Sequence, residues 1–372
     1  MNADWFRAEN EQDIPSPGLL LISERIDANL RLMIEIAGDP ARLRPHVKTH
    51  KLGPIVQRQL ALGITKYKCA TIAEAEMLAT CGVPDVLIAY PMVGPNCGRL
   101  ARLAAKYPQT RFGATIDHPV PLLALSQAVA AAGQTVDAYL DINCGMNRTG
   151  IVPGDSAVAL YQQISRSPGL RGAGFHVYDG HNSQEALADR TKAVETLLAP
   201  VLKMRGELER GGFPVSTLVM GGTPTFPIHA KHDIPGVECS PGTLSLHDYN
   251  YGNRYPEIGI TPAALLLTRV ISRPSDGLMT LDLGYKAVSP DQPAGKRCVL
   301  LNVPEYEAVL QNEEHFVVRS PHAQDFTPGD VVYAMPAHVC PTVALHRQAL
   351  VVENGQVVDR WDIVARDREL ST

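Results

Sequence analysis

The chain has 372 residues, of which 45% are apolar and 20% charged, and its net charge is −5. This composition is typical of folded enzymes and excludes a disordered chain. The sequence has no block of like charge and no apolar run near the ~18 residues that a membrane span needs. The N-terminus carries acidic residues where a secretory signal would carry an apolar stretch. We therefore expect neither a nucleic-acid nor a membrane partner. Seven scattered cysteines, an odd number, favour reduced thiols and a cytoplasmic location.

The first two-thirds of the chain alternates short β-rich runs with helical stretches. Apolar residues at helical spacing predict an amphipathic helix between residues 26 and 37. Eight strands are then predicted, at 43–48, 64–70, 85–90, 111–116, 136–142, 172–178, 217–222 and 236–240. Thr71 and Glu74 have the spacing of a helix capping box. Eight strands alternating with helices predict a closed (β/α)8 barrel of the TIM type, and no GxGxxG motif supports a doubly wound sheet.

After about residue 261 the pattern changes to consecutive strands without helices. Strands are predicted at 265–273, 278–284, 297–303, 315–320 and 331–337. A hairpin is predicted over 349–361, because Asn354-Gly355 suits the positive φ angles of a type I′ turn. We therefore predict an α/β protein with a barrel domain over 22–260 and an antiparallel β domain made of 1–21 and 261–372.

Lys48 closes the first predicted strand, and active sites of such barrels lie at the C-terminal ends of the strands. In a barrel mouth a lysine amine loses its proton more easily and can form an imine with a carbonyl group. The alternative is a lysine whose stem covers apolar surface at a strand end. His46, two residues earlier, faces the same side of the strand, beside the site or in the core.

Two loops after the last predicted strands are rich in glycine and hydroxyl side chains. Residues 221–225 read GGTPT and residues 240–243 read SPGT. Loops at these positions commonly bind phosphate, because glycine lets backbone N–H groups approach an anion. Each loop alone is equally typical of an ordinary turn. Together with Lys48 they predict a phosphorylated cofactor that forms an imine.

Five motifs carry a resemblance to a known family: RPHVKTHK (44–51), CATIAEAE, NCGMNRTG, HVYDGH and PAHVCPT. In combination, over residues 15 to 368, they resemble the fold-type III pyridoxal-phosphate enzymes. The nearest group is that of D-threonine aldolase and D-serine dehydratase, with alanine racemase more distant. The resemblance implies a barrel that holds pyridoxal 5′-phosphate, a β domain that completes the site, and a homodimer.

The resemblance also implies roles for single residues. Lys48 would form the imine with the cofactor, and Arg148 would lie beside the cofactor's phenolic oxygen, where a fixed cation suits an oxyanion. Arg148 taken alone is equally typical of a surface arginine. Tyr178 would reach the pyridine nitrogen or its surroundings. The other expected cofactor-binding residues are His46, Gly222, Thr223, Ser240, Gly242 and Thr243.

His338 and Cys340 form the expected metal site. On an extended segment residues i and i+2 face the same side, so the imidazole and the thiolate can share one cation. Their ligand type favours zinc, and manganese would fit a shell dominated by carboxylate or water. In aldolases of this family a histidine follows the tyrosine of the YxG motif, and His181 is the candidate base. Another group could take that part.

Three functions remain open at this point. The first is a D-3-hydroxy-amino-acid aldolase, which the general pattern of the chain favours. The second is a D-serine or D-3-hydroxyaspartate dehydratase, which the H-x-C pair favours; both need an imine and a metal-bound hydroxyl. The third is a non-catalytic pyridoxal-phosphate carrier, which the β domain with its metal-ligand pair disfavours. A racemase is disfavoured because metal ligands have no role in moving one α-proton.

Overall fold

The computed structural model describes residues 5–372, which its contacts divide into two compact units. The barrel unit comprises residues 33–48, 53–242 and 367–372, and the β unit comprises residues 5–32, 49–52 and 243–366. Residues 1–4, which fall in the predicted β domain, lie outside the described residues. Helix α1 (Ser23–Ala37) confirms the predicted amphipathic helix.

The barrel unit is built on a parallel sheet whose seven strands stand in chain order. They are β2 (Lys66–Cys69), β3 (Asp85–Pro91), β4 (Arg111–Ile116), β5 (Val136–Asp141), β6 (Leu170–Val177), β7 (Thr217–Met220) and β8 (Val237–Cys239). Leu43 pairs in parallel with Cys239 of β8, and His46 pairs in parallel with Lys68 of β2. Residues 43–46 thus link the two edge strands and close the barrel, which confirms the predicted fold class.

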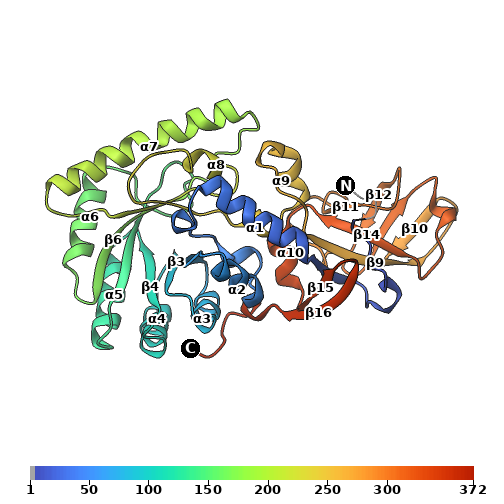
Figure 1. Cartoon of the computed structure of the whole chain (residues 1–372), viewed down its shortest axis with the longest axis horizontal. Coiled ribbons are helices and arrows are strands. Elements are labelled where there is room, and N and C mark those ends of the chain that lie inside the picture. Colours follow the sequence, from blue (N-terminus) through green and yellow to red (C-terminus); the bar gives the residue numbers. More distant parts are fainter. Residues whose placement is uncertain (1–4) are drawn as a thin grey trace. The chain divides into compact units, whose positions relative to one another are not determined.

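Helices follow the strands and lie on the outer side of the barrel (Figure 1). They are α2 (Gly53–Ala61), α3 (Ile72–Thr80), α4 (Pro95–Lys106), α5 (Pro119–Ala131), α6 (Asp155–Arg166), α7 (Leu187–Arg210) and the short α8 (Phe226–His229). Helix α3 starts at the predicted capping box, since Thr71 Oγ1 accepts from Glu74 N–H at 3.1 Å. The Glu74 carboxylate in turn accepts from Ala70 N–H at 2.6 Å.

The barrel interior combines an apolar layer with a buried ionic layer. The apolar layer contains Leu87, Tyr139, Ala173 and Val219, one from each of four strands. Near the N-terminal ends of the strands, Arg44 binds Asp85 at 2.7 Å and Glu238 at 2.5 Å, with almost no exposure of Arg44. Because active sites occupy the opposite end of such barrels, we assign this ionic layer to stability.

The β unit contains a nine-stranded sheet with the main order β12-β13-β10-β9-β1-β15-β16, while β14 pairs with β9 and β11 pairs with β14. Its strands are β1 (Gly18–Ile22), β9 (Ala264–Ser272), β10 (Leu278–Leu281), β11 (Cys298–Leu300), β12 (Glu307–Gln311), β13 (Phe316–Arg319), β14 (Val331–Pro336), β15 (Gln348–Glu353) and β16 (Gln356–Asp362). Helices α9 (Tyr249–Arg254) and α10 (Val339–Leu345) accompany it. All pairings are antiparallel except that of β1 with β15.

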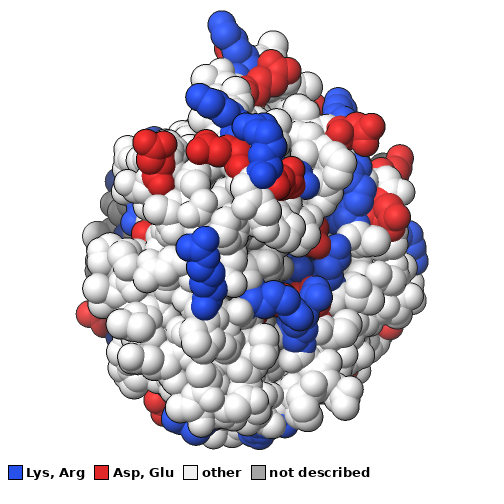
Figure 2. All heavy atoms as spheres, turned by 90° about the vertical axis from the view of Figure 1, so that its left-hand side faces the viewer, with Lys and Arg blue, Asp and Glu red and all other residues white. Residues whose placement is uncertain are grey.

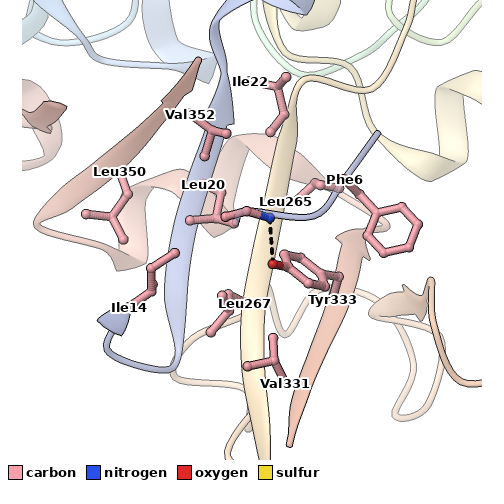
Figure 3. Packing of buried hydrophobic residues seen from close by; sticks show 11 residues of the cluster. Phe6, Ile14, Leu20, Ile22, Leu265, Leu267, Val331, Tyr333, Leu350 and Val352 are labelled. Carbon is pink, nitrogen blue, oxygen red and sulfur yellow. Dashed lines mark hydrogen bonds between the residues drawn. The ribbon is translucent and has the colours of Figure 1, made fainter. Parts of the chain in front are cut away.

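The core of the β unit joins segments far apart in the sequence (Figure 3). Leu20 of β1 and Leu265 of β9 lie in its centre and are fully buried. Tyr333 of β14 packs its ring against Phe6 and accepts a hydrogen bond from Ala8 N–H at 2.9 Å. The N-terminal segment is therefore an integral part of this unit.

Two further features of the β unit, a turn and a helix, can be compared with what the sequence predicted. The predicted type I′ turn is present, with φ of 50° at Asn354 and 77° at Gly355. Helix α10 was not expected, because PAHVCPT resembles an extended segment. Pro341 is tolerated there because it lies in the first turn, where the helix leaves its backbone N–H groups unpaired.

Side chains of both charge signs lie next to one another on the face shown in Figure 2, where large areas carry no charge. No helix in the part of the chain that the structure describes is long and apolar enough to cross a membrane.

Candidate active site

A cavity of about 510 Å³ opens at the C-terminal ends of the barrel strands. Its polar walls come from the ends of β2 and β6 and from the segments after residue 43 and after β5. Apolar residues on and after β3 complete it. The lining residues are His46, Lys48, Lys68, Ala70, Ala89, Tyr90, Pro91, Val93, Arg148, Thr149, His176 and Tyr178. The barrel thus brings four of the predicted site residues, Lys48, His46, Arg148 and Tyr178, into one cavity.

Three cationic side chains approach the ring of Tyr178. The distance to the ring centroid is 4.8 Å for Arg148 Cζ, 5.4 Å for Lys68 Nζ and 5.9 Å for Lys48 Nζ. His46 stands beside Lys48, and its Nδ1 accepts from the Lys48 backbone N–H at 3.3 Å. The cavity is therefore electropositive and suits an anionic ligand.

Behind Tyr178 a buried chain of polar side chains runs across three strands. His176 Nδ1 lies 2.7 Å from the Asp141 carboxylate, and His176 Nε2 lies 3.5 Å from Lys68 Nζ. Burial lowers the pKa of His176, although Asp141 acts in the opposite direction. A neutral His176 donates from Nδ1 to the carboxylate, which can only accept, and presents Nε2 as an acceptor to Lys68.

The electrostatics of this chain single out Lys68. Its side chain is 2% exposed, and burial together with the positive charge of Lys48 lowers the pKa of Lys68 to about 7. The pKa of Asp141 is lowered, because the interaction with His176 outweighs the opposing effect of burial. Lys68 therefore changes its charge near neutral pH.

Buried hydrogen bonds hold the predicted phosphate loop after β7 in place. Gly222 N–H donates to Thr225 Oγ1 at 3.2 Å, and that hydroxyl donates to Asp179 at 2.8 Å. His229 Nε2 lies 2.9 Å from the other Asp179 oxygen, and both side chains are fully buried. The buried His229 Nδ1 has no hydrogen-bond partner in the described chain. A Cβ at Gly222 would lie 3.1 Å from Tyr178 Cε2, a tight contact that would require the ring or the loop to shift by a few tenths of an ångström.

The other predicted phosphate-binding residues divide between the units. Thr223 and Ser240 are buried in the barrel unit, where the Ser240 hydroxyl donates to the Arg44 carbonyl at 2.9 Å. Gly242 ends that part of the barrel unit, and Thr243 begins a segment of the β unit. Phosphate binding by these residues stays a prediction.

His181 lies in a second cavity of about 830 Å³, between the segment after β5 and helix α7. This cavity also includes Cys144 and Gly145 and shares no lining residue with the cavity of Lys48. His181 is exposed, and a Cβ at Gly145 would lie 2.8 Å from its Nε2. The structure thus does not bring His181 together with Lys48, and its role as the base stays a prediction.

In the β unit, His338 and Cys340 meet at the start of α10. His338 caps the helix and Cys340 lies in its first turn, so the expected extended segment is wrong. The helical turn nevertheless brings the two side chains close enough for Cys340 to raise the pKa of His338. Thr49 Oγ1 lies 3.1 Å from Cys340 Sγ, and Thr243 Oγ1 lies 3.7 Å from it.

A carboxylate orients the imidazole of this pair. His338 Nδ1 lies 2.5 Å from Asp291 Oδ2, so Nε2 is the ring nitrogen that this carboxylate does not hold. Burial acts against protonation of His338, but Cys340 and Asp291 raise its pKa to about 9. No group of three or more His, Cys, Asp and Glu side chains suited to a metal is found among the described residues.

The residues present fit both groups that the resemblance implies. For pyridoxal phosphate the barrel provides the Lys48 amine, the Arg148 cation and a glycine loop that a Cβ would fill. For a divalent cation the β unit provides one imidazole nitrogen and one sulfur, with the imidazole already oriented by Asp291. Two protein ligands leave coordination positions open for a substrate, as catalytic metal sites require.

Comparisons with known proteins agree with this geometry. Residues 22–245 match the alanine racemase N-terminal domain, and residues 263–352 match the putative serine dehydratase domain. A D-threonine aldolase of Arthrobacter sp. is 30% identical over 95% of this chain and 93% of that protein. The crystal structure of a D-threonine aldolase from Filomicrobium marinum has a TM-score of 0.88 at 30% identity, covering 95% of this chain and 96% of that chain. The D-threo-3-hydroxyaspartate dehydratase of Delftia sp. is 26% identical over 94% of this chain and 97% of that protein.

The fold, the lysine-containing cavity and these matches define a pyridoxal-phosphate enzyme of the alanine racemase fold. The chain belongs to the alanine racemase N-terminal domain family, and to those members that also carry a serine dehydratase-like domain.

Sequence reasoning missed Lys68 and His176, which line the cavity, Asp141, which is hydrogen-bonded to His176, and the buried pair Asp179 and His229 that supports the glycine loop. A signal for the first set was present. Lys68, Asp141 and His176 are charged or polar side chains near the ends of otherwise apolar strands, where side chains of one parity face the barrel interior. No comparable signal links Asp179 to His229, which lie fifty residues apart.

Proposed function

We propose that the protein is a pyridoxal-phosphate- and divalent-metal-dependent lyase that cleaves D-3-hydroxy amino acids, such as D-threonine, into glycine and an aldehyde. The observation that carries the proposal is the convergence of Lys48, Arg148 and Tyr178 in one barrel cavity. Its support is the 30% identity to a D-threonine aldolase over nearly the full length of both chains. The D configuration rests on the names of the relatives.

When bound, pyridoxal phosphate supplies a conjugated ring that withdraws electrons from the α-carbon of an attached amino acid. Lys48 would hold the cofactor covalently until the substrate amine replaces it. Arg148 would place a fixed positive charge against an oxyanion in the cavity. Tyr178 would offer a hydroxyl, and no carboxylate, to the ring nitrogen, while Gly222, Thr223 and Ser240 with Gly242 and Thr243 would receive the phosphate.

The bond changes of the cleavage assign further tasks to this chain. The 3-hydroxyl gives up its proton, its C–O bond becomes the C=O bond of the aldehyde, and the Cα–Cβ bond breaks. The α-carbon then takes up one proton to give glycine. His181 is the proposed acceptor of the hydroxyl proton. His338 and Cys340 would hold the cation, zinc on ligand type, that lowers the pKa of the 3-hydroxyl.

A D-serine or D-3-hydroxyaspartate dehydratase is the second candidate. It is favoured by the match of residues 263–352 to the putative serine dehydratase domain and by the dehydratase at 26% identity. In this reaction Lys48 would take the α-proton and the metal would assist the departure of hydroxide. The carrier hypothesis has less support, because a carrier gives no role to His338 and Cys340.

Covalent trapping tests the cofactor site. Borohydride reduction of the yellow holoenzyme should bleach its colour and fix the cofactor to Lys48, as located by mass spectrometry of the digested protein. Lys48→Arg keeps the positive charge and should abolish the adduct. An adduct on Lys51 or on Lys68 in the unmodified protein would contradict the assignment.

A further inference from the structure

A carboxylate outside the proposed ligand pair holds the imidazole of His338. His338 Nδ1 lies 2.5 Å from Asp291 Oδ2. The two side chains are 38% and 41% exposed, and an ion pair at such exposure contributes little to the stability of a fold. Folding stability therefore gives little reason for the contacts that keep Asp291 in place.

A chain of hydrogen bonds fixes Asp291 relative to helix α10. The Ser289 hydroxyl donates to Asp291 Oδ1, and the Gln292 side-chain amide donates to Asp291 Oδ2 at 3.3 Å. Ser289 N–H donates to Thr342 Oγ1 at 3.1 Å, and that hydroxyl donates to the His338 carbonyl oxygen at 2.8 Å. Ser289 and Thr342 are buried. Because the chain begins and ends at His338, it holds the carboxylate and the imidazole in a fixed relation to each other.

This arrangement determines which nitrogen of His338 can meet a cation. A carboxylate only accepts hydrogen bonds, so Nδ1 carries a proton and donates to Asp291, and the lone pair for a cation is that of Nε2. A cation at Nε2 withdraws electrons from the ring, which makes Nδ1–H a stronger donor to the carboxylate. The negative charge of Asp291 adds to that of a Cys340 thiolate, and both favour a divalent cation.

We propose that Asp291, held by Ser289, is the positioning residue of the metal site: it fixes the ring of His338 with Nε2 as the ligand atom and thereby sets the affinity for a divalent cation. This inference rests on the proposed metal role of His338 and Cys340. Histidine ligands of metals commonly donate their other ring N–H to a carboxylate, and loss of that partner lowers metal affinity or activity about 10–100-fold. Imidazole and thiolate ligands favour zinc as the cation.

The experiment measures zinc affinity and does not depend on turnover. The holoenzyme is freed of metal by chelation and titrated with Zn²⁺ in competition with a chromophoric chelator, which gives the Kd. Asp291→Ala removes the carboxylate, and Asp291→Asn keeps an oxygen acceptor without its charge. The matched control is Asp325→Ala, because Asp325 forms another exposed carboxylate–imidazole pair of the β unit, with His322 Nδ1 at 3.2 Å.

Asp291→Ala should raise the Kd for Zn²⁺ about 10–100-fold, Asp291→Asn should raise it less, and Asp325→Ala should leave it unchanged. The urea midpoint of the metal-free protein should be the same in all variants, since both pairs are exposed. Equal Kd values for Asp291→Ala and Asp325→Ala would overturn the proposal and leave the proposed function intact. A lower urea midpoint in Asp291→Ala alone would assign Asp291 to the fold and also overturn it. Absence of zinc binding by the unmodified holoenzyme would overturn both this inference and the metal step of the proposed function.

Ser289→Ala tests whether the serine acts through the carboxylate. Alone, it should raise the Kd for Zn²⁺ by a smaller factor than Asp291→Ala does. Combined with Asp291→Ala, it should add nothing, because the carboxylate that it holds is absent. A further rise in the double variant, equal to that of Ser289→Ala alone, would overturn the role assigned to Ser289.

Discussion

Tyr178 shows how closely single residues determine the candidate site. The side chains of Lys48, Lys68 and Arg148 approach its ring within one cavity, and the ring lies against the glycine loop after β7. A methyl group at Gly222 would lie 3.1 Å from the ring, so a side chain there would require the ring or the loop to shift by a few tenths of an ångström. The buried side chains of Asp179 and His229, which hold this loop, therefore affect the cavity although they do not line it.

The pair of Asp179 and His229 gives a prediction about cofactor affinity. His229→Phe removes a buried hydrogen bond to a carboxylate that also holds Thr225, and through it the Gly222 N–H. A charge-assisted bond contributes about 1.5–3 kcal/mol, so we expect the Kd for pyridoxal phosphate to rise about tenfold or more. Fluorescence titration of the apoprotein measures this Kd. The control is His232→Phe, whose ring lies 6.2 Å from that of His229. Equal Kd values for the two variants would contradict the expectation.

Cys340 gives a prediction about the metal. Cys340→Ala removes one of two proposed ligands, so bound metal, measured by inductively coupled plasma mass spectrometry, and turnover should fall together. Excess metal should restore part of the activity. Chelation should abolish turnover and leave the colour, since the colour depends on Lys48 in the other unit. Cys298→Ala, at a buried thiol on β11, is the matched control. A fully active preparation without a bound divalent ion would remove the metal from the mechanism.

Among single residues, those that belong to a recognisable motif can be predicted from the sequence. Residues whose role depends on contacts that form only in the folded protein are missed. Lys48, Arg148 and Tyr178 were predicted from RPHVKTHK, GMNRTG and HVYDGH, and they do share a cavity. Lys68 and His176 were not singled out, because their contact depends on two strands separated by three others in the sheet. The assignments of single roles, including that of His181, stay predictions.

At the scale of elements, the ionic layer links five segments of the barrel. Arg44 binds Asp85 and Glu238, and Arg111 binds Asp85 and Asp137. Burial acts to raise the pKa of Asp85, but Arg44 and Arg111 hold it below its usual value. A carboxyl with a lowered folded-state pKa stabilises the fold above its unfolded pKa of about 3.9, and the stabilisation is lost as the pH falls through the folded value.

Asp85→Asn tests this layer. It leaves Arg44 buried with one carboxylate fewer, and breaking a buried pair costs about 3–5 kcal/mol. The difference in the free energy of unfolding between the unmodified protein and the variant, from urea denaturation, should be largest above about pH 5 and shrink towards about pH 3. Asp155→Asn, at an exposed position at the start of α6, should change stability little at any of these pH values. A difference that does not depend on pH would contradict the expectation.

Elements were predicted where local chemistry and tertiary structure agree. The capping box of α3 and the Asn354-Gly355 turn form where expected, because each depends on residues a few positions apart. The expected strand over 43–48 is reduced to two bridges, since a helical turn begins at Val47. Helix α10 was missed because the pair His338 and Cys340 was placed on an extended segment, and β12 was missed because its residues are largely exposed.

At the scale of the whole molecule, the α/β barrel and the antiparallel sheet followed from the change in pattern near residue 261. Strand–helix alternation stops there, and alternation is what a parallel sheet requires. Residues 1–21 were predicted to belong to the β domain, but the pattern could not show that β1 pairs with β9 and β15, since these strands lie hundreds of residues away. The domain limits, the homodimer and the cytoplasmic location stay predictions.

The proposed reaction is tested most directly by product analysis of the purified holoenzyme with D-threonine and D-serine, with the L-isomers as controls. The proposed function predicts equal amounts of glycine and acetaldehyde from D-threonine, loss of both products on chelation, and little turnover of L-threonine. Pyruvate and ammonia from D-serine, with no glycine from D-threonine, would contradict the aldolase and establish the dehydratase.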